Sequence, residues 1–270
     1  MIHALSIDLE DWYHGFKHAE AQRFQQLESR IEHTTQMVLD LLGNVKATFF
    51  VLGRVAEQYP HLIRQIHSEG HEIGVHSHAH HTVYEQTSQD FKADLDRVLT
   101  CLKELIGNDI FGYRAPRFSI TKKSLWALDI LCEAGLKYDS SIFPTLTTDY
   151  GIADAPRFAH PVLNSEQKLW EIPPSTVKFF GKNLPCAGGF YTRAMPYAYT
   201  KWGISKVAAE SQPAVMYFHP WEFDPGAPRP KLTLRDKLIH YYGLKGMQRK
   251  FKRLLSDFEF APICQVFNIQ

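Results

Sequence analysis

Two histidines, His76 and His80, lie four residues apart in the histidine-rich stretch of residues 70–81. At this spacing two imidazoles can bind one metal ion. A lone pair of this kind is more often part of a solvated loop, so further ligands are needed before it indicates a site. An acidic group near the N-terminus offers a carboxylate and consists of Asp8, Glu10 and Asp11. Two histidines and one carboxylate leave positions open for water and substrate, which is typical of catalytic zinc, with cobalt or nickel as alternatives.

Other residues suit the hydrolysis of an amide or ester at such a metal. This reaction needs a base for the attacking water and an acid for the leaving group. The remaining groups are a carboxylate beside the metal, Arg114, which would hold such a base ionised, and a distant histidine, His219. Arg114 could instead be solvated at the end of a strand, and His219 could be a hydrogen-bonded core histidine.

The elements that would position these residues alternate between strand and helix. Apolar runs predict strands, which cover residues 4–7, 47–52, 71–75, 110–113, 136–138, 169–173 and 214–218. Apolar residues at helical spacing predict helices over about 23–42, over a segment that ends at Gly70, between Thr87 or Ser88 and Gly107, between a capping Thr121 and Gly135, and over 196–210. The pattern predicts a long loop over 143–168, a turn or bulge at 188–191, and one or two basic amphipathic helices over 236–258.

This alternation predicts a mainly parallel sheet, which places its functional residues at the carboxyl ends of the strands. The candidates follow different strands. The acidic group follows the first, the histidine pair the third, Arg114 the fourth, Asp139 the fifth and His219 the last. Titratable residues at one end of most strands are hard to explain as separate loop decorations, so this placement favours a metal site.

The composition limits the other functions. A chain of 270 residues that is 44% hydrophobic is typical of one α/β domain. A formal net charge of +1 gives no general electrostatic case for nucleic-acid binding. Four widely spaced cysteines without a CxxC pattern indicate reduced thiols. The N-terminus enters a strand pattern at once, and no later run is apolar enough to span a bilayer, so a cytoplasmic location is expected.

Several segments together resemble the NodB-homology polysaccharide deacetylases, carbohydrate esterase family four. The segments are SIDLED at 6–11, TFFVLG at 48–53, HSHAH at 76–80, RAP at 114–116 and FHP at 218–220. Their order and spacing agree over roughly residues 4–225. Within that family the chain is most similar to the subgroup found beside exopolysaccharide and exosortase loci.

The resemblance implies a distorted (β/α) barrel with about seven strand-helix units, in one domain over residues 1–270 with 236–270 as a C-terminal helical extension. It implies removal of N-acetyl groups from amino sugars of a polysaccharide or a lipid-linked glycan precursor. Asp8 would activate a metal-bound water, His76 and His80 would bind the metal, and Arg114 would pair with the base. His219 would protonate the departing amine.

One departure from the family concerns the carboxylate ligand. Common members have two adjacent aspartates, whereas Leu9 follows Asp8 here, so the ligand must be Glu10 or Asp11. Alternation along an extended segment puts Glu10 on the same side as Asp8, which favours Glu10. Asp11 would then be a turn residue or contact His14. Asp139 resembles the aspartate that orients the catalytic histidine, and a cap at the strand end is its alternative role.

Aromatic residues near these motifs could stack on sugar rings, although packing alone explains each of them singly. The candidates for substrate binding are Trp12, Tyr113, Tyr191 and Trp221. The basic tail could contact a membrane surface, but a charged outer helical face is ordinarily solvated. Two other functions are compatible with the fold, namely hydrolysis of a small amide or formyl compound and an inactive carbohydrate-binding scaffold.

Overall fold

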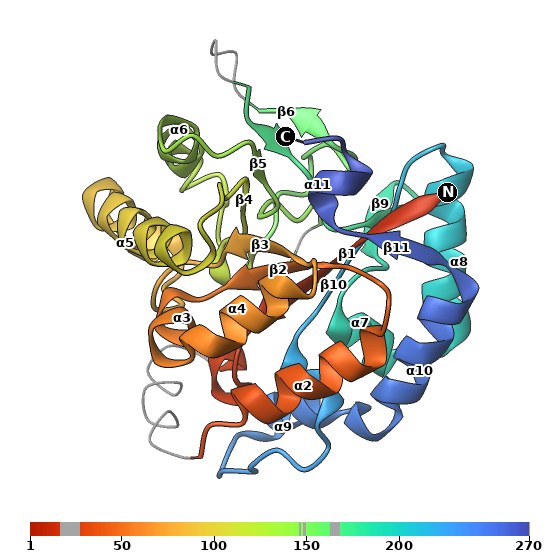
Figure 1. Ribbon diagram of the computed structural model, residues 1–270. Helices are drawn as coiled ribbons and strands as arrows, with labels where there is room; N and C mark the ends of the chain where they lie inside the picture. Colours follow the sequence, from red (N-terminus) through yellow and green to blue (C-terminus); the bar gives the residue numbers. More distant parts are fainter. Residues whose placement is uncertain (17–27, 146, 148–149, 163–167, 270) are drawn as a thin grey trace.

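The computed structural model describes residues 1–16, 28–145, 147, 150–162 and 168–269. Its main feature is a curved sheet with the strand order β10-β1-β2-β3-β4-β5-β7-β6, in which β11 also pairs with β1. All pairs in this sheet are parallel except β6 with β7. The strands are β1 (Ile2–Leu9), β2 (Thr48–Val51), β3 (Glu72–Val75), β4 (Gly112–Tyr113), β5 (Tyr138–Asp139), β6 (His160–Pro161), β7 (Trp170–Glu171), β10 (Val215–Phe218) and β11 (Glu259–Ala261). The predicted α/β fold is confirmed, and Figure 1 shows helices arranged around the sheet.

The centre of the sheet is buried on both faces. β10 pairs with one edge of β1, and β2 and β11 pair with the other edge, β11 beside the start of β1 and β2 beside its end. In β2, neighbouring residues point to opposite faces, yet Phe49 and Phe50 are both fully buried. Phe49 packs in the main core and Phe50 in a smaller cluster with Tyr138. Covered parallel sheets require such continuous apolar strands, which explains why these runs were readable in the sequence.

The helices are α2 (Ile31–Leu42), α3 (Gly53–Gln58), α4 (Pro60–Ser68), α5 (Ser88–Ile106), α6 (Trp126–Glu133), α7 (Gly189–Ala194), α8 (Tyr197–Ala209), α9 (Leu234–Tyr241), α10 (Leu244–Asp257) and α11 (Ile263–Val266). Longer helices such as α2, α5 and α10 bury one apolar face each. The ends of α5 are as predicted, because the Thr87 hydroxyl accepts from the Asp90 amide and Gly107 adopts a left-handed φ of 68°. The later part of the first predicted helix is present as α2, which begins at Ile31 after the non-helical residues 28–30. Residues 23–27 of that prediction lie outside the described residues.

Three local predictions were wrong. Thr121 does not cap α6, since its amide donates to Ser124 Oγ and the helix begins only at Trp126. The expected turn at 188–191 is the start of α7, which Gly188 precedes with a φ of 99°. The expected loop over 143–168 includes β6, which pairs with β7. A separate hairpin of β8 (Thr176–Phe179) and β9 (Lys182–Pro185) was not predicted.

The C-terminal segment is part of the core structure. The predicted pair of basic helices is present as α9 and α10. After them, β11 pairs with β1, and the amides of Ile263 and Cys264 donate to Thr48 Oγ1 and Glu72 Oε2. These bonds satisfy the first amides of α11 and attach the end of the chain to β2 and β3.

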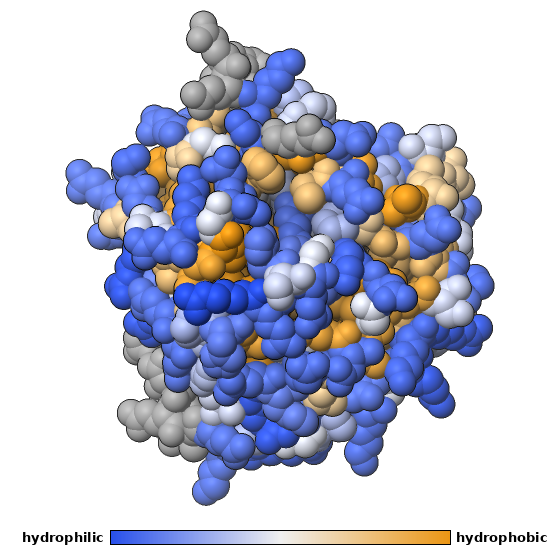
Figure 2. All heavy atoms as spheres, viewed as in Figure 1, coloured by the Kyte–Doolittle hydropathy of each residue, from blue (hydrophilic) through white to orange (hydrophobic). Residues whose placement is uncertain are grey.

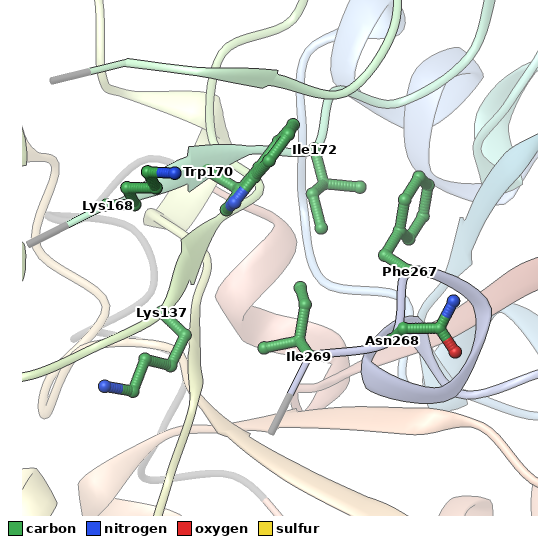
Figure 3. Close-up of a pocket in the computed structure, with 7 residues that line it drawn as sticks. All are labelled: Lys137, Lys168, Trp170, Ile172, Phe267, Asn268 and Ile269. Carbon is green, nitrogen blue, oxygen red and sulfur yellow. The ribbon is translucent and has the colours of Figure 1, made fainter. Parts of the chain in front are cut away.

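Within the described residues no helix combines the length and the apolar character needed to cross a bilayer. On the face seen in Figure 2, hydrophilic side chains cover most of the surface and hydrophobic side chains show between them. A cavity of about 390 Å³ lies where β5 and β7 begin, and side chains of β7 and of the chain's end face one another around it (Figure 3). Lys137 and Lys168, which precede these strands, lie at its edge, and no residue of the predicted site lines it.

Candidate active site

The predicted catalytic and metal-binding residues meet at the carboxyl ends of the strands, where Asp8, Glu10, His80 and His219 line a cleft of about 600 Å³. Asp8 lies at the end of β1 and Glu10 just beyond it. His76 follows β3, Arg114 follows β4 and His219 follows β10. Parallel strands therefore bring together residues that are up to about two hundred positions apart in the chain, as the rule for such sheets predicts.

Glu10, His76 and His80 form a compact group that could hold a metal ion. Glu10 Oε1 lies 2.8 Å from His76 Nε2 and 2.9 Å from His80 Nε2, and all three side chains are buried. The loop between the histidines turns sharply, with left-handed φ values of 62° at Ser77 and 61° at His80. Ser77 Oγ accepts from the His80 amide and stabilises this turn, which directs both imidazoles at one carboxylate.

The hydrogen bonding of His76 shows that the group suits a cation. His76 Nδ1 lies 2.7 Å from the carbonyl oxygen of Arg114, so this nitrogen carries the proton. The Nε2 of the neutral ring then carries an unshared lone pair, which faces a carboxylate oxygen of Glu10. Two acceptors at this distance need a metal ion or an extra proton between them. Burial opposes ionisation of Glu10, but His80, His219 and His76 hold the pKa of its carboxyl well below its usual value.

The structure distinguishes Glu10 from Asp11. The Asp11 carboxylate accepts from the Trp12 and Arg30 amides and from Ser29 Oγ at 2.5 Å, so it faces away from the histidines. It caps a short 3₁₀ helix, η1 (Trp12–Gly15), and the Asp11 amide donates to His14 Nδ1. Asp11 is thus a turn residue in contact with His14, and Glu10 is the carboxylate placed against the imidazoles.

Asp8 and Arg114 form a buried ion pair beside this group. Arg114 Nη1 donates to Asp8 Oδ1 at 2.7 Å, and the arginine is fully buried. Its other donors reach Ser6 Oγ at 2.7 Å and the Ser140 carbonyl and hydroxyl at 3.1 and 2.8 Å. The guanidinium also lies over the Phe50 ring, 4.3 Å from its centroid. These contacts hold Arg114 in one orientation and exclude the alternative of a solvated arginine.

His219 lies on the other side of Asp8, with Nε2 3.8 Å from Asp8 Oδ2. Its Nδ1 lies 3.2 Å from Oε2 of Glu222, a residue that the sequence reading did not select. Burial of the imidazole favours its neutral form, but Glu10, Glu222 and Asp8 outweigh it and raise the pKa of His219 to about 9. At neutral pH His219 is therefore protonated and can act as an acid. The His219–Glu222 spacing is that of a capping box, the one signal by which Glu222 could have been found.

Asp139 does not take the orienting position expected from the resemblance. Its carboxylate accepts from the Ser141 hydroxyl and shares a hydrogen bond with the buried carboxyl of Glu171. Burial raises the pKa of Asp139 to about 6 and that of Glu171 further. The carboxylate that contacts His219 is Glu222.

The structure contradicts two of the four aromatic predictions. Trp12 and Tyr113 are 0% exposed, so neither can stack on a sugar ring, and both predictions were wrong. Trp12 packs with Phe16 and Trp221 in a small apolar cluster. Trp221 lines the cleft, but it is buried and its ring stacks on His219 and on His240, so its role in sugar binding stays a prediction. Tyr191 is not among the lining residues. The neighbouring Phe190 takes that place and is 36% exposed.

The remaining histidines of the opening stretch have structural contacts. His71 Nδ1 accepts from the Ala47 amide at the start of β3. His78 points away from His76 and His80, with Nε2 3.1 Å from Glu57 Oε1. Neither histidine belongs to the group of Glu10, His76 and His80.

Comparison with known families accounts for both halves of the chain. Residues 24–138 match the family model described as polysaccharide deacetylase, and residues 140–268 match a domain of unknown function, DUF3473. The chain contains a polysaccharide deacetylase domain. The catalytic arrangement described above draws residues from both matched regions, because His219 and Glu222 lie in the second one.

Curated relatives of the deacetylase domain match over part of their length. A peptidoglycan-N-acetylglucosamine deacetylase of Bacillus cereus is 34% identical over 98 residues, which are 35% of this chain and 36% of the relative. A chitooligosaccharide deacetylase of Azorhizobium caulinodans is 32% identical over 71 residues, which are 26% of this chain and 34% of the relative. The matches thus span about a third of these relatives.

Solved structures share the fold over nearly the whole chain. A candidate polysaccharide deacetylase of Mycobacterium smegmatis has a TM-score of 0.67 at 20% identity, covering 98% of this chain and 88% of its own. Puue allantoinase has a TM-score of 0.63 at 13% identity with the same coverage. A pseudoenzyme of carbohydrate esterase family four from Bacillus anthracis has 0.51 at 12%, covering 98% and 64%. Because this fold occurs in all three, the activity has to be argued from the residues.

Proposed function

We propose that this protein is a metal-dependent hydrolase that removes N-acetyl groups from amino sugars of a glycan. The proposal rests on one observation. The group of Glu10, His76 and His80 lies beside both the Asp8–Arg114 pair and the protonated His219. A candidate metal site, base and acid are thereby within reach of one bound amide. The glycan substrate is supported by the relatives, whose names give peptidoglycan N-acetylglucosamine and chitooligosaccharide.

Glu10, His76 and His80 would hold the divalent ion, and their mixed nitrogen and oxygen donors suit zinc first, then cobalt or nickel. When bound there, the ion would act as a Lewis acid toward the acetyl carbonyl. Asp8 would accept a proton from the attacking water. Arg114 would hold the Asp8 carboxylate in position for this step, because its buried guanidinium donates to Asp8 Oδ1 at 2.7 Å.

His219 would complete the reaction on the other side of the amide. As the carbon–nitrogen bond breaks, its imidazolium would give a proton to the departing amine, and acetate would remain as the second product. The carboxylates around His219, namely Glu10, Glu222 and Asp8, raise its pKa, and Glu222 and Asp8 would still favour the imidazolium with a cation bound at Glu10. The cleft is large enough for more than a small amide, since its walls include Phe190 and Tyr150 beyond the catalytic residues.

Two alternatives are tested by the same assay. The first is a small amide or formyl substrate, and the allantoinase with this fold gives it a structural precedent. The second is an inactive binding scaffold, against which the full set of Asp8, Arg114 and His219 argues. The exopolysaccharide-locus subgroup, a lipid-linked substrate, membrane contact and a cytoplasmic location stay predictions.

The experiment is a substrate panel with the zinc-loaded protein. We expect acetate from chitooligosaccharides or poly-N-acetylglucosamine, together with a free amine on the sugar. Activity on small amides or formyl compounds alone would favour the first alternative. Binding of oligosaccharides without acetate release from any substrate would favour the scaffold.

A further inference from the structure

The carboxylate of Glu222 is held on both oxygens. Oε2 accepts from the His219 amide at 3.0 Å and lies 3.2 Å from His219 Nδ1. Oε1 accepts from Arg193 Nε at 2.8 Å. Glu222 and Arg193 are each 1% exposed at the side chain, whereas His219 is 19% exposed toward the cleft. A buried ion pair thus lies directly behind the candidate acid.

Arg193 is in turn held by the C-terminal segment. It belongs to α7, and its Nη atoms donate to the carbonyls at the end of α9. Nη1 reaches the His240 and Tyr242 carbonyls at 3.3 and 2.6 Å, and Nη2 reaches the Ile239 carbonyl at 3.2 Å. These carbonyls have no partner within their own helix, and a cation is favourable at a helix C-terminus. Arg193 therefore connects the end of α9 with Glu222.

The backbone of Arg193 is also held, by α10. Lys250 Nζ donates to the carbonyls of Thr192, Arg193 and Met195, each within 2.9 Å. Close packing confines Glu222 from the other side, because a Cβ at Gly189 would lie 1.6 Å from Glu222 Oε2. The carboxylate has no room to move toward α7, so its position is determined.

A second connection runs through stacked rings. The His219 ring stacks on Trp221, with centroids 5.4 Å apart, and Trp221 stacks on His240 of α9 at 4.2 Å. His240 stacks on Phe16 at 4.3 Å. Burial lowers the pKa of His240 to about 3, so this ring packs as a neutral imidazole and adds no charge beside His219. The stack and the ion pair both extend from His219 to α9.

We propose that Arg193 is a positioning residue, which holds Glu222 against His219 and is itself held by the carbonyl end of α9, so that the C-terminal segment aligns the acid of the reaction. This inference rests on the proposed function. Glu222 fixes the Nδ1 proton of His219 and leaves Nε2 directed at the cleft, where the leaving amine would lie. Without Arg193, Glu222 Oε1 would lose its buried donor, so the carboxylate would no longer be held in this orientation against His219.

Two substrates separate positioning of an acid from a general structural role. An N-acetyl sugar needs protonation of its amine leaving group, whereas 4-nitrophenyl acetate releases a stable phenolate without it. In the zinc-loaded protein, Arg193→Met should lower kcat for the N-acetyl oligosaccharide by about 10–100-fold, with KM changed less than about twofold. Hydrolysis of 4-nitrophenyl acetate, measured above the Asp8→Asn background, should stay within about twofold of the wild type. His219→Ala should show the same selectivity with a larger loss.

Coupling and a matched control complete the test. If Arg193 acts through Glu222, the Arg193→Met/Glu222→Gln pair should lose no more activity than the worse single variant. Arg193→Lys should recover part of the loss, since one ammonium keeps the charge but cannot reach Glu222 and the α9 carbonyls together. Arg157→Met removes another arginine–glutamate pair, 2.9 Å from Glu210, and should leave both activities unchanged.

The outcomes are distinguishable from failure of the proposed function. A wild type that releases no acetate from any N-acetyl sugar contradicts the proposed function. A wild type that does so, with an Arg193→Met variant equal to it or equally impaired on both substrates, overturns the positioning role alone. Should Arg193→Met fail to fold by circular dichroism, Glu222→Gln takes its place in the two-substrate assay, and a loss that is equal on both substrates again counts against the inference.

Discussion

His76 Nε2 lies 2.8 Å from Glu10 Oε1, although the ring proton is on the other nitrogen, Nδ1, which donates to the Arg114 carbonyl. Two acceptors face each other at hydrogen-bond distance, so a cation between them would relieve their repulsion. We therefore expect the purified protein to bind one zinc ion per chain, and a chelator to remove activity that added zinc restores. Metal analysis before and after dialysis against the chelator measures this.

Single histidine substitutions test which residues bind the metal. His76→Ala and His80→Ala should each lower zinc affinity by more than about 100-fold, because losing even an outer partner of a ligand costs 10–100-fold. His78→Gln is the matched control, since His78 lies between them in the loop but contacts Glu57. Zinc affinity of His78→Gln should equal that of the wild type, and an equal loss in all three variants would point to the loop fold instead of coordination.

The Asp8–Arg114 pair predicts a separation of activity from stability. Asp8→Asn keeps an oxygen acceptor for Arg114 but removes the base, so we expect a loss of about 10²–10⁴-fold in kcat with the fold retained. Arg114→Met leaves Asp8 buried without a partner and should lower the free energy of unfolding by about 3–5 kcal/mol. The double variant should recover part of that stability in urea unfolding, and a purely additive loss would speak against direct pairing.

Neighbouring aromatic residues on α7 provide a test of the cleft. Phe190 lines it and is 36% exposed, whereas Tyr191 does not line it. Loss of one stacking contact of about 1 kcal/mol predicts that Phe190→Ala raises KM for an oligosaccharide about fivefold. Tyr191→Phe should leave KM unchanged. The reverse pattern would restore the original assignment of Tyr191.

The buried His71 predicts a pH dependence of stability. Burial lowers its pKa to about 4, below the ordinary 6.5, and its Nδ1 must stay unprotonated to accept from the Ala47 amide. The unfolded chain then binds more protons than the folded one between these values, so the contribution of His71 is present above pH 6.5 and is lost as the pH falls toward 4.

His71→Asn keeps an acceptor near the Nδ1 position and removes the titration. Relative to this variant, the wild type should lose about 2 kcal/mol of unfolding free energy between pH 7 and pH 5. Urea unfolding of both proteins at the two pH values, with metal removed, measures the difference. Parallel pH curves would show that His71 does not titrate as a buried neutral imidazole.

The sequence contained most of the information for the strand ends and little for the contacts between distant segments. Asp8 and Glu10 could be assigned to one side because alternation along an extended chain is a local property. The turn that brings His80 back beside His76 is likewise local, although its left-handed residues were not foreseen. Such features follow from neighbouring residues, so pattern analysis reaches them.

Sequence patterns were less able to predict which side chains are buried and which distant residues pair. The position of Trp12 beside the acidic motif predicts a sugar-binding residue. The side chain is buried instead, because Phe16 and Trp221 pack over it. Nothing in the sequence distinguishes Arg193 from other charged residues that follow a glycine turn. Its role depends on the end of α9, more than forty residues further on. Sequence spacing carries no signal for such contacts, because the tertiary fold alone makes them.

The central claim is tested most directly by acetate release from an N-acetylglucosamine oligomer, measured with zinc-loaded wild type and with Asp8→Asn. We predict one acetate for each free amine formed, a rate that a chelator abolishes, and a rate at least about 100-fold lower in Asp8→Asn. No acetate from the zinc-loaded wild type, or equal rates for the two proteins, would contradict the account.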